Sequence, residues 1–173
     1  MASRTVRRAW AALLLGLLLA AGKPGAAMPP EDPLLNKPAP AFVRDDLSGR
    51  HVDLAAYRGK VVLLNFWASW CAPCQLEMPR FAAWQHQYGA AGLRVVGVSM
   101  DEEAAGTRRV CRKLGVDYPV VMGDAELGTL YGGVFGLPVT YLIGRDGQVR
   151  ARFQGESDLK AMEARIRELL DGR

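Results

Sequence analysis

The most informative stretch of the chain reads Val61-Val62-Leu63-Leu64-Asn65-Phe66-Trp67-Ala68-Ser69-Trp70-Cys71-Ala72-Pro73-Cys74. Its first seven residues are nearly all apolar and do not alternate with polar ones, which is typical of a strand buried on both faces in a parallel or mixed sheet. A helical pattern follows over residues 72–88, where Phe81 and Trp84 share one face. The sequence therefore predicts that two cysteines lie where a buried strand meets a helix.

Cys71 and Cys74 are spaced for thiol–disulfide exchange, a reaction in which the thiolate is the attacking form. Free backbone N–H groups and the helix dipole stabilise a thiolate at a helix N-terminus, so Cys71 is the predicted nucleophile. Cys74 lies one helical turn further on, where it can attack a mixed disulfide at Cys71 and release the partner. Trp70, beside the nucleophile, is expected to form part of a docking surface.

Two other interpretations of the cysteine pair are a purely structural disulfide and half of a four-ligand zinc or copper site. A cross-link around a two-residue loop stabilises little, because the entropic gain grows with loop length. A closed zinc site needs further ligands, and only Cys111, His51 and His86 remain. Cys111 shares an apolar helix face and is expected to be a small buried hydrophobe. Both histidines are expected at the surface, without a catalytic role.

Glu77 follows Cys74 by three residues and is expected on the same face of the helix. In that position it could exchange a proton with the thiol that must lose one. The alternative is an ordinary solvated glutamate, because this spacing is common in helices and the burial that raises a pKa cannot be read from it.

Hydrophobic periodicity predicts the remaining strands at residues 41–43, 51–53, 93–99, 119–122, 139–143 and 148–153, and the remaining helices at residues 101–115, 126–131 and 159–169. Asp101 is the expected N-cap of the first of these helices. The turn Asp146-Gly147 joins the last two strands into an antiparallel hairpin, and a short hairpin precedes the central strand. The order predicts an α/β fold, with a mixed central sheet flanked by helices and an added N-terminal β-hairpin.

Residues 1–27 have the pattern of a secretory signal peptide. Arginines precede an apolar stretch of 13 residues, Ala9 to Ala21, which is shorter than the ~20 residues of a spanning helix. Small residues at Gly25 and Ala27 favour cleavage after Ala27, and an uncleaved membrane anchor is the alternative. The proline-rich residues 28–40 are predicted to be a linker, and residues 41–173 the folded domain.

The net positive charge of the chain comes from this leader. The formal net charge is +4, and residues 1–27 hold four basic side chains and no acidic one. The rest of the chain is formally neutral, which excludes the basic face expected of a nucleic-acid-binding protein.

The segment from Asn65 to Cys74 resembles the active-site segment of thioredoxin-fold proteins, and is most similar to that of exported TlpA-like and ResA-like thiol–disulfide oxidoreductases. The resemblance covers residues 38–171 and implies a thioredoxin fold. It also rests on the N-terminal hairpin, Glu77, Val96-Gly97-Val98-Ser99 and Gly136-Leu137-Pro138-Val139-Thr140-Tyr141-Leu142-Ile143.

The resemblance assigns roles to further residues. The proline that matches Pro138 is cis in this family, lies against the cysteine pair and leaves the backbone of the preceding residue, here Leu137, free to pair with a substrate chain. With Trp70 and Pro73, these residues form the expected substrate-binding surface. Thioredoxin itself has a buried acid where this chain has Asn65. In ResA-like proteins, the glutamate that matches Glu77 is thought to assist deprotonation of a cysteine instead.

An enzyme of this kind reduces protein disulfides in a bacterial periplasm or at the outer membrane face, often on the haem-binding cysteines of apocytochrome c or on copper-site cysteines. The resemblance also implies a membrane electron-donor protein that recharges it. No intrinsic cofactor and no metal are implied, because the Cys71–Cys74 disulfide and dithiol forms carry the two electrons.

Two alternative functions are left open. A thiol peroxidase of the peroxiredoxin type shares the fold, but it needs a threonine three residues before its cysteine, where this chain has Ala68. A copper(I) metallochaperone could use the two soft thiolates, although Pro73 and Pro138 would crowd the sulfurs.

Overall fold

The computed structural model of the protein describes residues 32–134 and 136–172, so the predicted signal peptide lies outside the described residues. The elements are, in chain order, β1 (Val43–Asp45), β2 (His51–Asp53), the short 3₁₀ helix η1 (Leu54–Tyr57), β3 (Val61–Trp67), α1 (Ala72–Tyr88), β4 (Leu93–Ser99), α2 (Ala104–Leu114), β5 (Val120–Met122), α3 (Ala125–Leu130), β6 (Val139–Ile143), β7 (Val149–Gln154) and α4 (Leu159–Leu170). None of the helices in the described ranges is long and apolar enough to cross a membrane.

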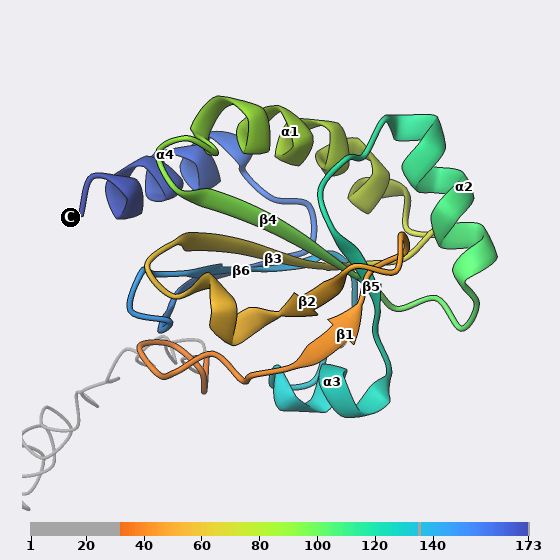
Figure 1. Cartoon of the computed structure of the whole chain (residues 1–173), viewed down its shortest axis with the longest axis horizontal. Helices are drawn as coiled ribbons and strands as arrows, with labels where there is room; N and C mark the ends of the chain where they lie inside the picture. The colour runs from red at the N-terminus through yellow and green to blue at the C-terminus, as the bar shows by residue number, and fades with distance from the viewer. Residues whose placement is uncertain (1–31, 135, 173) are drawn as a thin grey trace, which may run out of the picture. The chain divides into compact units, whose positions relative to one another are not determined.

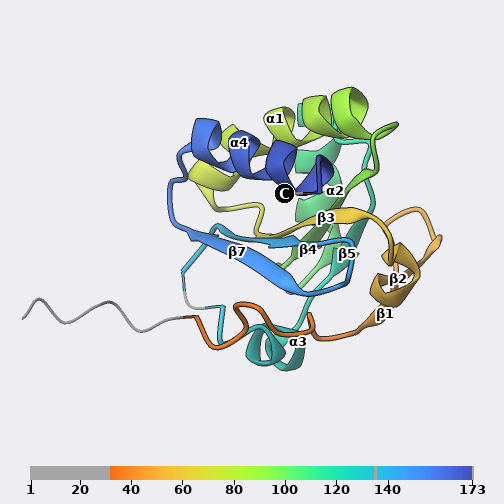
Figure 2. The same cartoon turned by 90° about the vertical axis from the view of Figure 1, so that its left-hand side faces the viewer.

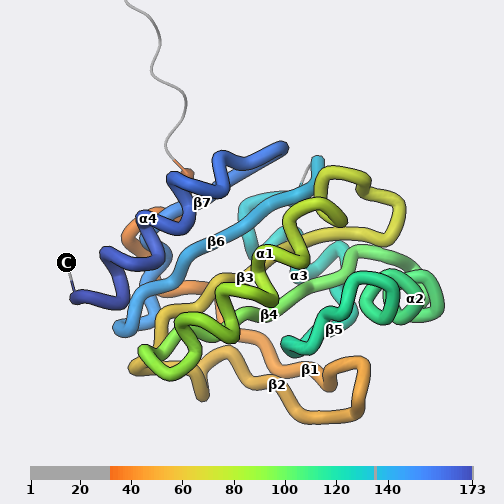
Figure 3. The backbone as a smooth tube through the Cα atoms, turned by 90° about the horizontal axis from the view of Figure 1, so that it is seen from above, coloured from red at the N-terminus to blue at the C-terminus, as the bar shows by residue number. Residues whose placement is uncertain are grey.

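Five strands form one mixed sheet in the order β5-β4-β3-β6-β7, which Figure 3 shows from above. β4 pairs in parallel with both β3 and β5, whereas β6 pairs antiparallel with both β3 and β7. β1 and β2 form a separate antiparallel hairpin. The predicted thioredoxin fold, with its mixed sheet and added hairpin, is confirmed. β3 has the predicted bounds, and all seven of its residues are buried.

Helices cover both faces of this sheet (Figures 1 and 2). On one face, α1, α2 and α4 enclose a hydrophobic cluster that includes Val61, Leu63 and Trp67 of β3. On the other face, α3, η1 and the hairpin pack against Leu64 and Phe66 of the same strand. Because successive side chains of a strand point to opposite faces, the central strand supplies both clusters and is fixed from both sides.

At one edge of the sheet, residues 36–39 run beside the turn that precedes β7 and beside the first residue of that strand. The Asn36 N–H donates to the Val149 carbonyl at 2.8 Å, and the Val149 N–H donates to the Lys37 carbonyl at 2.9 Å. Residues 32–40, which the sequence assigns to a linker, therefore include a segment that is hydrogen-bonded to the sheet.

The other edge is closed by the N-terminal hairpin. The Leu47 N–H donates to the Val120 carbonyl of β5 at 2.8 Å, and Asp46 forms an antiparallel bridge with Val121. Both outer strands thus find a partner in the residues that precede the central strand. β5 pairs with Asp46 and Leu47, whereas β7 is paired in this way at its first residue, Val149.

The start of α2 differs from the prediction. Asp101 is not its N-cap; Glu103 holds that position, and its side chain makes no capping hydrogen bond. The Asp101 carboxylate instead accepts hydrogen bonds from Ser69, in the segment before the cysteines, and from Thr107 inside α2. The prediction is wrong because a local pattern cannot reveal a partner 32 residues away in the sequence.

Candidate active site

Cys71 is the N-cap of α1, where the segment after β3 turns into the helix. Its Sγ accepts a hydrogen bond from the Cys74 backbone N–H at 3.3 Å. Pro73 lies in the first turn, where a residue without an N–H removes a donor that would otherwise lack a helical partner. The sulfur of Cys71 therefore lies at the positive end of a 17-residue helix, which favours its anionic form.

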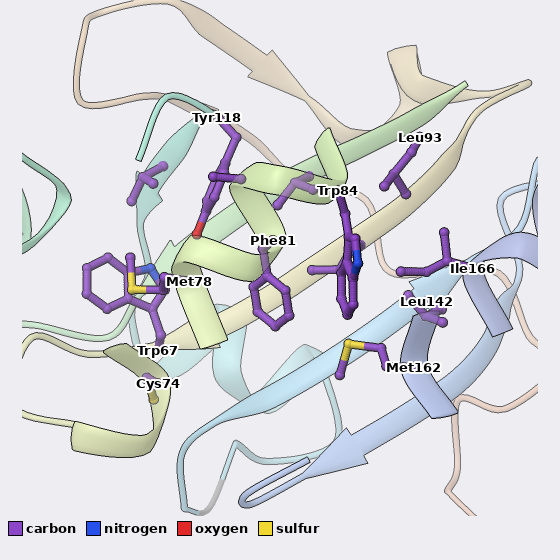
Figure 4. Close-up of a cluster of buried hydrophobic side chains, with 14 of the residues drawn as sticks. Trp67, Cys74, Met78, Phe81, Trp84, Leu93, Tyr118, Leu142, Met162 and Ile166 are labelled. Atoms are coloured by element: carbon purple, nitrogen blue, oxygen red, sulfur yellow. The ribbon is translucent and has the colours of Figure 1, made fainter. Parts of the chain in front are cut away.

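The two cysteines form a disulfide in this structure, with Cα atoms 5.3 Å apart. Cys71 is 5% exposed and Cys74 is 1% exposed, and both belong to the cluster beneath α1. Figure 4 shows Cys74 at one end of this cluster, near Trp67 and Met78. Cys71, the predicted nucleophile, is the more exposed of the two.

Glu77 is a buried carboxyl on α1, with 4% of its surface exposed. Its Oε1 accepts a hydrogen bond from the Ser157 backbone N–H at 3.1 Å, and its Oε2 is buried without a hydrogen-bond partner in the described part of the chain. Burial raises the pKa of Glu77 above its ordinary value, and the hydrogen bonds from Ser157 only partly offset this. Such a group holds or releases a proton closer to neutral pH than an ordinary glutamate does.

Asn65 occupies the middle of β3 and is completely buried. Its Nδ2 donates to Thr140 Oγ1 at 2.9 Å, across the β3–β6 pair. An amide does not titrate, so Asn65 cannot exchange a proton with the cysteines. Of the two buried carboxyl side chains in the described residues, Asp46 lies in the hairpin turn and Glu77 on the helix of the cysteines.

The predicted substrate-binding residues differ in exposure. Trp70 is 72% exposed, although it directly precedes a buried cysteine. Leu137 is partly buried and packs against the cluster that contains both cysteines. The Leu137–Pro138 peptide bond is cis, the conformation that the family resemblance implies. Pro138 itself is buried, and its carbonyl accepts a hydrogen bond from the Gly155 N–H at 2.9 Å.

The sequence analysis missed the side chains that hold the segment before Cys71. The Ser69 carbonyl accepts a hydrogen bond from Gln75 Nε2 at 2.8 Å, and the Ser69 N–H donates to the Asp101 carboxylate. The contact between Ser69 and Asp101 follows from the register of the sheet, which no local sequence pattern gives. In the parallel β3–β4 pair Trp67 lies opposite Ser99, so residues two positions later in each strand's continuation emerge at the same edge of the sheet.

The remaining candidates lie where the sequence predicts. Cys111 is buried and free, and burial raises the pKa of its thiol to about 11, so it stays protonated and weakly reactive. His51 and His86 are exposed and pair with Asp45 and Asp117. The described residues contain no group of three or more histidine, cysteine, aspartate or glutamate side chains that could hold a metal ion.

This arrangement can carry out thiol–disulfide exchange in two steps. In the reduced protein, the Cys71 thiolate attacks one sulfur of a substrate disulfide; that bond breaks, the leaving sulfur takes up a proton, and a mixed disulfide forms. The Cys74 thiol then loses its proton to a base and attacks the Cys71 sulfur. The mixed disulfide breaks, the second substrate sulfur leaves as a thiolate and takes up a proton, and the Cys71–Cys74 bond forms, so that two electrons have passed to the substrate.

A cysteine pair at the first turn of the helix that follows the central strand is the reactive centre of thioredoxin-fold thiol–disulfide oxidoreductases, and this is the class of enzyme to which fold and site point. Residues 35–152 match the AhpC/TSA family. The chain is 33% identical to the thiol-disulfide oxidoreductase ResA of Bacillus anthracis over 137 residues, which are 78% of each protein. It is 36% identical to ResA of Bacillus subtilis over 112 residues, which are 64% of this chain and 62% of that protein.

The fold is also similar to solved structures of thiol–disulfide exchange proteins. A thiol:disulfide interchange protein of the thioredoxin family from Chlorobium tepidum superposes with a TM-score of 0.71 at 28% identity, covering 77% of this chain and 95% of that one. A secreted thiol-disulfide isomerase from Corynebacterium glutamicum superposes with a TM-score of 0.70 at 26% identity, covering 77% and 85%. The chain belongs to the AhpC/TSA family and, within it, to the ResA-like thiol-disulfide oxidoreductases.

Proposed function

We propose that the protein reduces disulfide bonds of exported proteins by dithiol–disulfide exchange, with Cys71 as nucleophile and Cys74 as resolving cysteine. The observation that carries this proposal is the position of Cys71 at the N-terminus of α1, where it is the more exposed of two buried cysteines and is joined to Cys74 one turn later. A thiolate stabilised by the helix attacks the substrate, and the protected second thiol limits the lifetime of the mixed disulfide.

Glu77 is the proposed proton acceptor for Cys74. Three-residue spacing on one helix brings the two side chains to neighbouring positions, and the buried Oε2 of Glu77 has no other partner among the described residues. Its raised pKa supports this role, because a general base works best when its pKa lies near the operating pH.

The proposed substrates are protein disulfides, such as the haem-binding cysteine pair of an apocytochrome c or the cysteines of a copper site. The exposed Trp70 ring, with Pro73, would contact the substrate chain. The backbone of Leu137, before the cis Pro138, would pair with it in an extended conformation. A membrane electron-donor protein would then return the Cys71–Cys74 disulfide to the dithiol.

The proposed location is the bacterial periplasm. The basic and apolar pattern of residues 1–27 supports export, and the similar protein of Corynebacterium glutamicum is a secreted one. The leader would be cleaved after Ala27 or kept as a membrane anchor, and residues 28–40 would follow it. Residues 41–173 would form the catalytic domain together with the hydrogen-bonded segment 36–39.

The test is reduction of a peptide that carries an internal disulfide in a Cys-x-x-Cys-His sequence, the haem-attachment pattern, with dithiothreitol as final reductant. The wild-type protein is expected to accelerate reduction, and Cys71→Ser is expected not to. Cys111→Ser is the matched control, because it removes a buried cysteine outside the pair and should keep the wild-type rate. Cys74→Ser should accumulate the mixed disulfide between Cys71 and the peptide.

Equal rates for wild type and Cys71→Ser would overturn the proposal. Two further readouts separate the alternatives. Stoichiometric binding of copper(I) by the reduced protein, without peptide reduction, would indicate a metallochaperone. Consumption of hydrogen peroxide in the presence of dithiothreitol would indicate a thiol peroxidase, for which the buried Ala68 offers no hydroxyl.

A further inference from the structure

The segment that precedes the nucleophile is held by the carboxylate of Asp101, which lies in the loop between β4 and α2. The Ser69 N–H lies 2.9 Å from Asp101 Oδ2 and 3.1 Å from Oδ1, and Ser69 Oγ donates to Oδ1 at 2.9 Å. From the other side, Gln75 Nε2 donates to the Ser69 carbonyl at 2.8 Å. The backbone N–H, the backbone carbonyl and the hydroxyl of Ser69, the residue before Trp70, therefore all make hydrogen bonds.

Asp101 is itself held rigidly. Its Oδ2 accepts hydrogen bonds from Ser99 Oγ at 2.9 Å and from Thr107 Oγ1 at 2.8 Å, and both hydroxyl residues are completely buried. Burial acts to raise the pKa of Asp101, but the hydrogen bonds from Thr107, Ser69 and Ser99 together bring it below its ordinary value. The group is therefore an anion at neutral pH, and hydrogen bonds to an anion are the stronger kind.

The first turn of α2 packs closely against Ser69 at Gly106. A Cβ atom at Gly106 would lie 2.8 Å from Ser69 Oγ, so only glycine allows the first turn of α2 to approach this closely. β4, α2 and the segment after β3 thus meet at Ser69. The next residue, Trp70, presents an aromatic side chain that is 72% exposed.

We propose that Asp101 is a positioning residue for substrate binding: its carboxylate holds Ser69 so that the Trp70 ring stands ready beside Cys71 for a protein substrate. An exposed aromatic ring binds well only when its backbone is ordered before the partner arrives, since otherwise binding must supply the ordering entropy. The inference rests on the proposed function, because it assigns Trp70 to the contact with the substrate chain.

The test measures KM and kcat for the oxidised Cys-x-x-Cys-His peptide in the full-length protein, together with the rate on glutathione disulfide, which is too small to need the docking surface. Asp101→Ala is expected to raise KM for the peptide roughly tenfold, the effect of losing hydrogen bonds to a charged group, with changes of no more than about twofold in kcat and in the glutathione disulfide rate. Asp101→Asn keeps one acceptor oxygen and should show a smaller rise in KM.

Glu103→Ala is the matched control. It removes the same charge two residues further on, from an exposed side chain that makes no capping bond, and should leave all three values unchanged. A double-mutant cycle supplies the second control. Once Trp70→Ala has raised KM, adding Asp101→Ala should raise it little further, because both changes remove the same contact.

Wild-type KM in Asp101→Ala, or an equal loss on both disulfides, would overturn the positioning role. Additive effects of Trp70→Ala and Asp101→Ala would also overturn it. If Asp101→Ala fails to fold, Asp101→Asn decides by the same criteria. Failure of the wild-type protein to reduce either disulfide would instead contradict the proposed function, so the two failures are distinguishable.

Discussion

At the scale of single residues, the buried carboxylate of Glu77 lowers the stability of the fold at neutral pH, and it is also the proposed base for Cys74. Because burial raises its pKa, the folded state binds this proton more tightly than the unfolded state, and the contribution of Glu77 to the free energy of unfolding falls as pH rises from 4.5 through the raised pKa. Glu77→Gln removes this titration and can still accept the Ser157 hydrogen bond. We expect its stability relative to wild type to improve between pH 4 and pH 8, measured by urea unfolding of the oxidised proteins.

The same substitution should impair catalysis. Without a base for the Cys74 proton, resolution of the mixed disulfide is expected to slow by about tenfold or more, measured by rapid quenching and mass spectrometry. Glu126→Gln, at an exposed position on α3, is the control and should change neither property. A variant Glu77→Gln that resolves the mixed disulfide at the wild-type rate would remove the proposed role as base.

At the scale of elements, α1 depends on Cys71 for its N-cap. Serine retains an acceptor at this position and alanine does not, so Cys71→Ser and Cys71→Ala differ in capping although both abolish the disulfide. Cys71→Ala is expected to be less stable than Cys71→Ser by about 1 kcal/mol in the free energy of unfolding, measured by urea titration. Equal stabilities would mean that the side chain at residue 71 does not cap the helix.

At the scale of the whole described domain, residues before β3 pair with both outer strands of the sheet, with β5 and with the start of β7. A chain that begins at Pro40 lacks the segment hydrogen-bonded to Val149, whereas a chain that begins at Met28 keeps it. The shorter chain is expected to have a lower Tm and to associate at high concentration, because an open edge strand can pair with another molecule. Equal Tm values and a monomeric shorter chain, by calorimetry and light scattering, would contradict this.

A feature could be predicted from the sequence when the residues that determine it are neighbours along the chain. β3, α1 and the Cys71–Cys74 pair are determined by neighbours along the chain, through an uninterrupted apolar run and a helical period, and each was predicted with its bounds. The contact between Asp101 and Ser69 depends on the register of two parallel strands. Glu77 accepts its hydrogen bond from Ser157, 80 residues away, so neither contact could be obtained from a local pattern.

The central claim is that Cys71 and Cys74 form a redox pair that works as a reductant. Its most direct test is the equilibrium reduction potential of the full-length protein in glutathione and dithiothreitol buffers, with Cys71→Ser as control. We predict a single two-electron step that is absent from Cys71→Ser, with a potential below about −230 mV. A potential near −120 mV, on the order of that of a strong oxidant, would contradict the reductive role, and a step that does not depend on Cys71 would contradict the assignment of the redox centre.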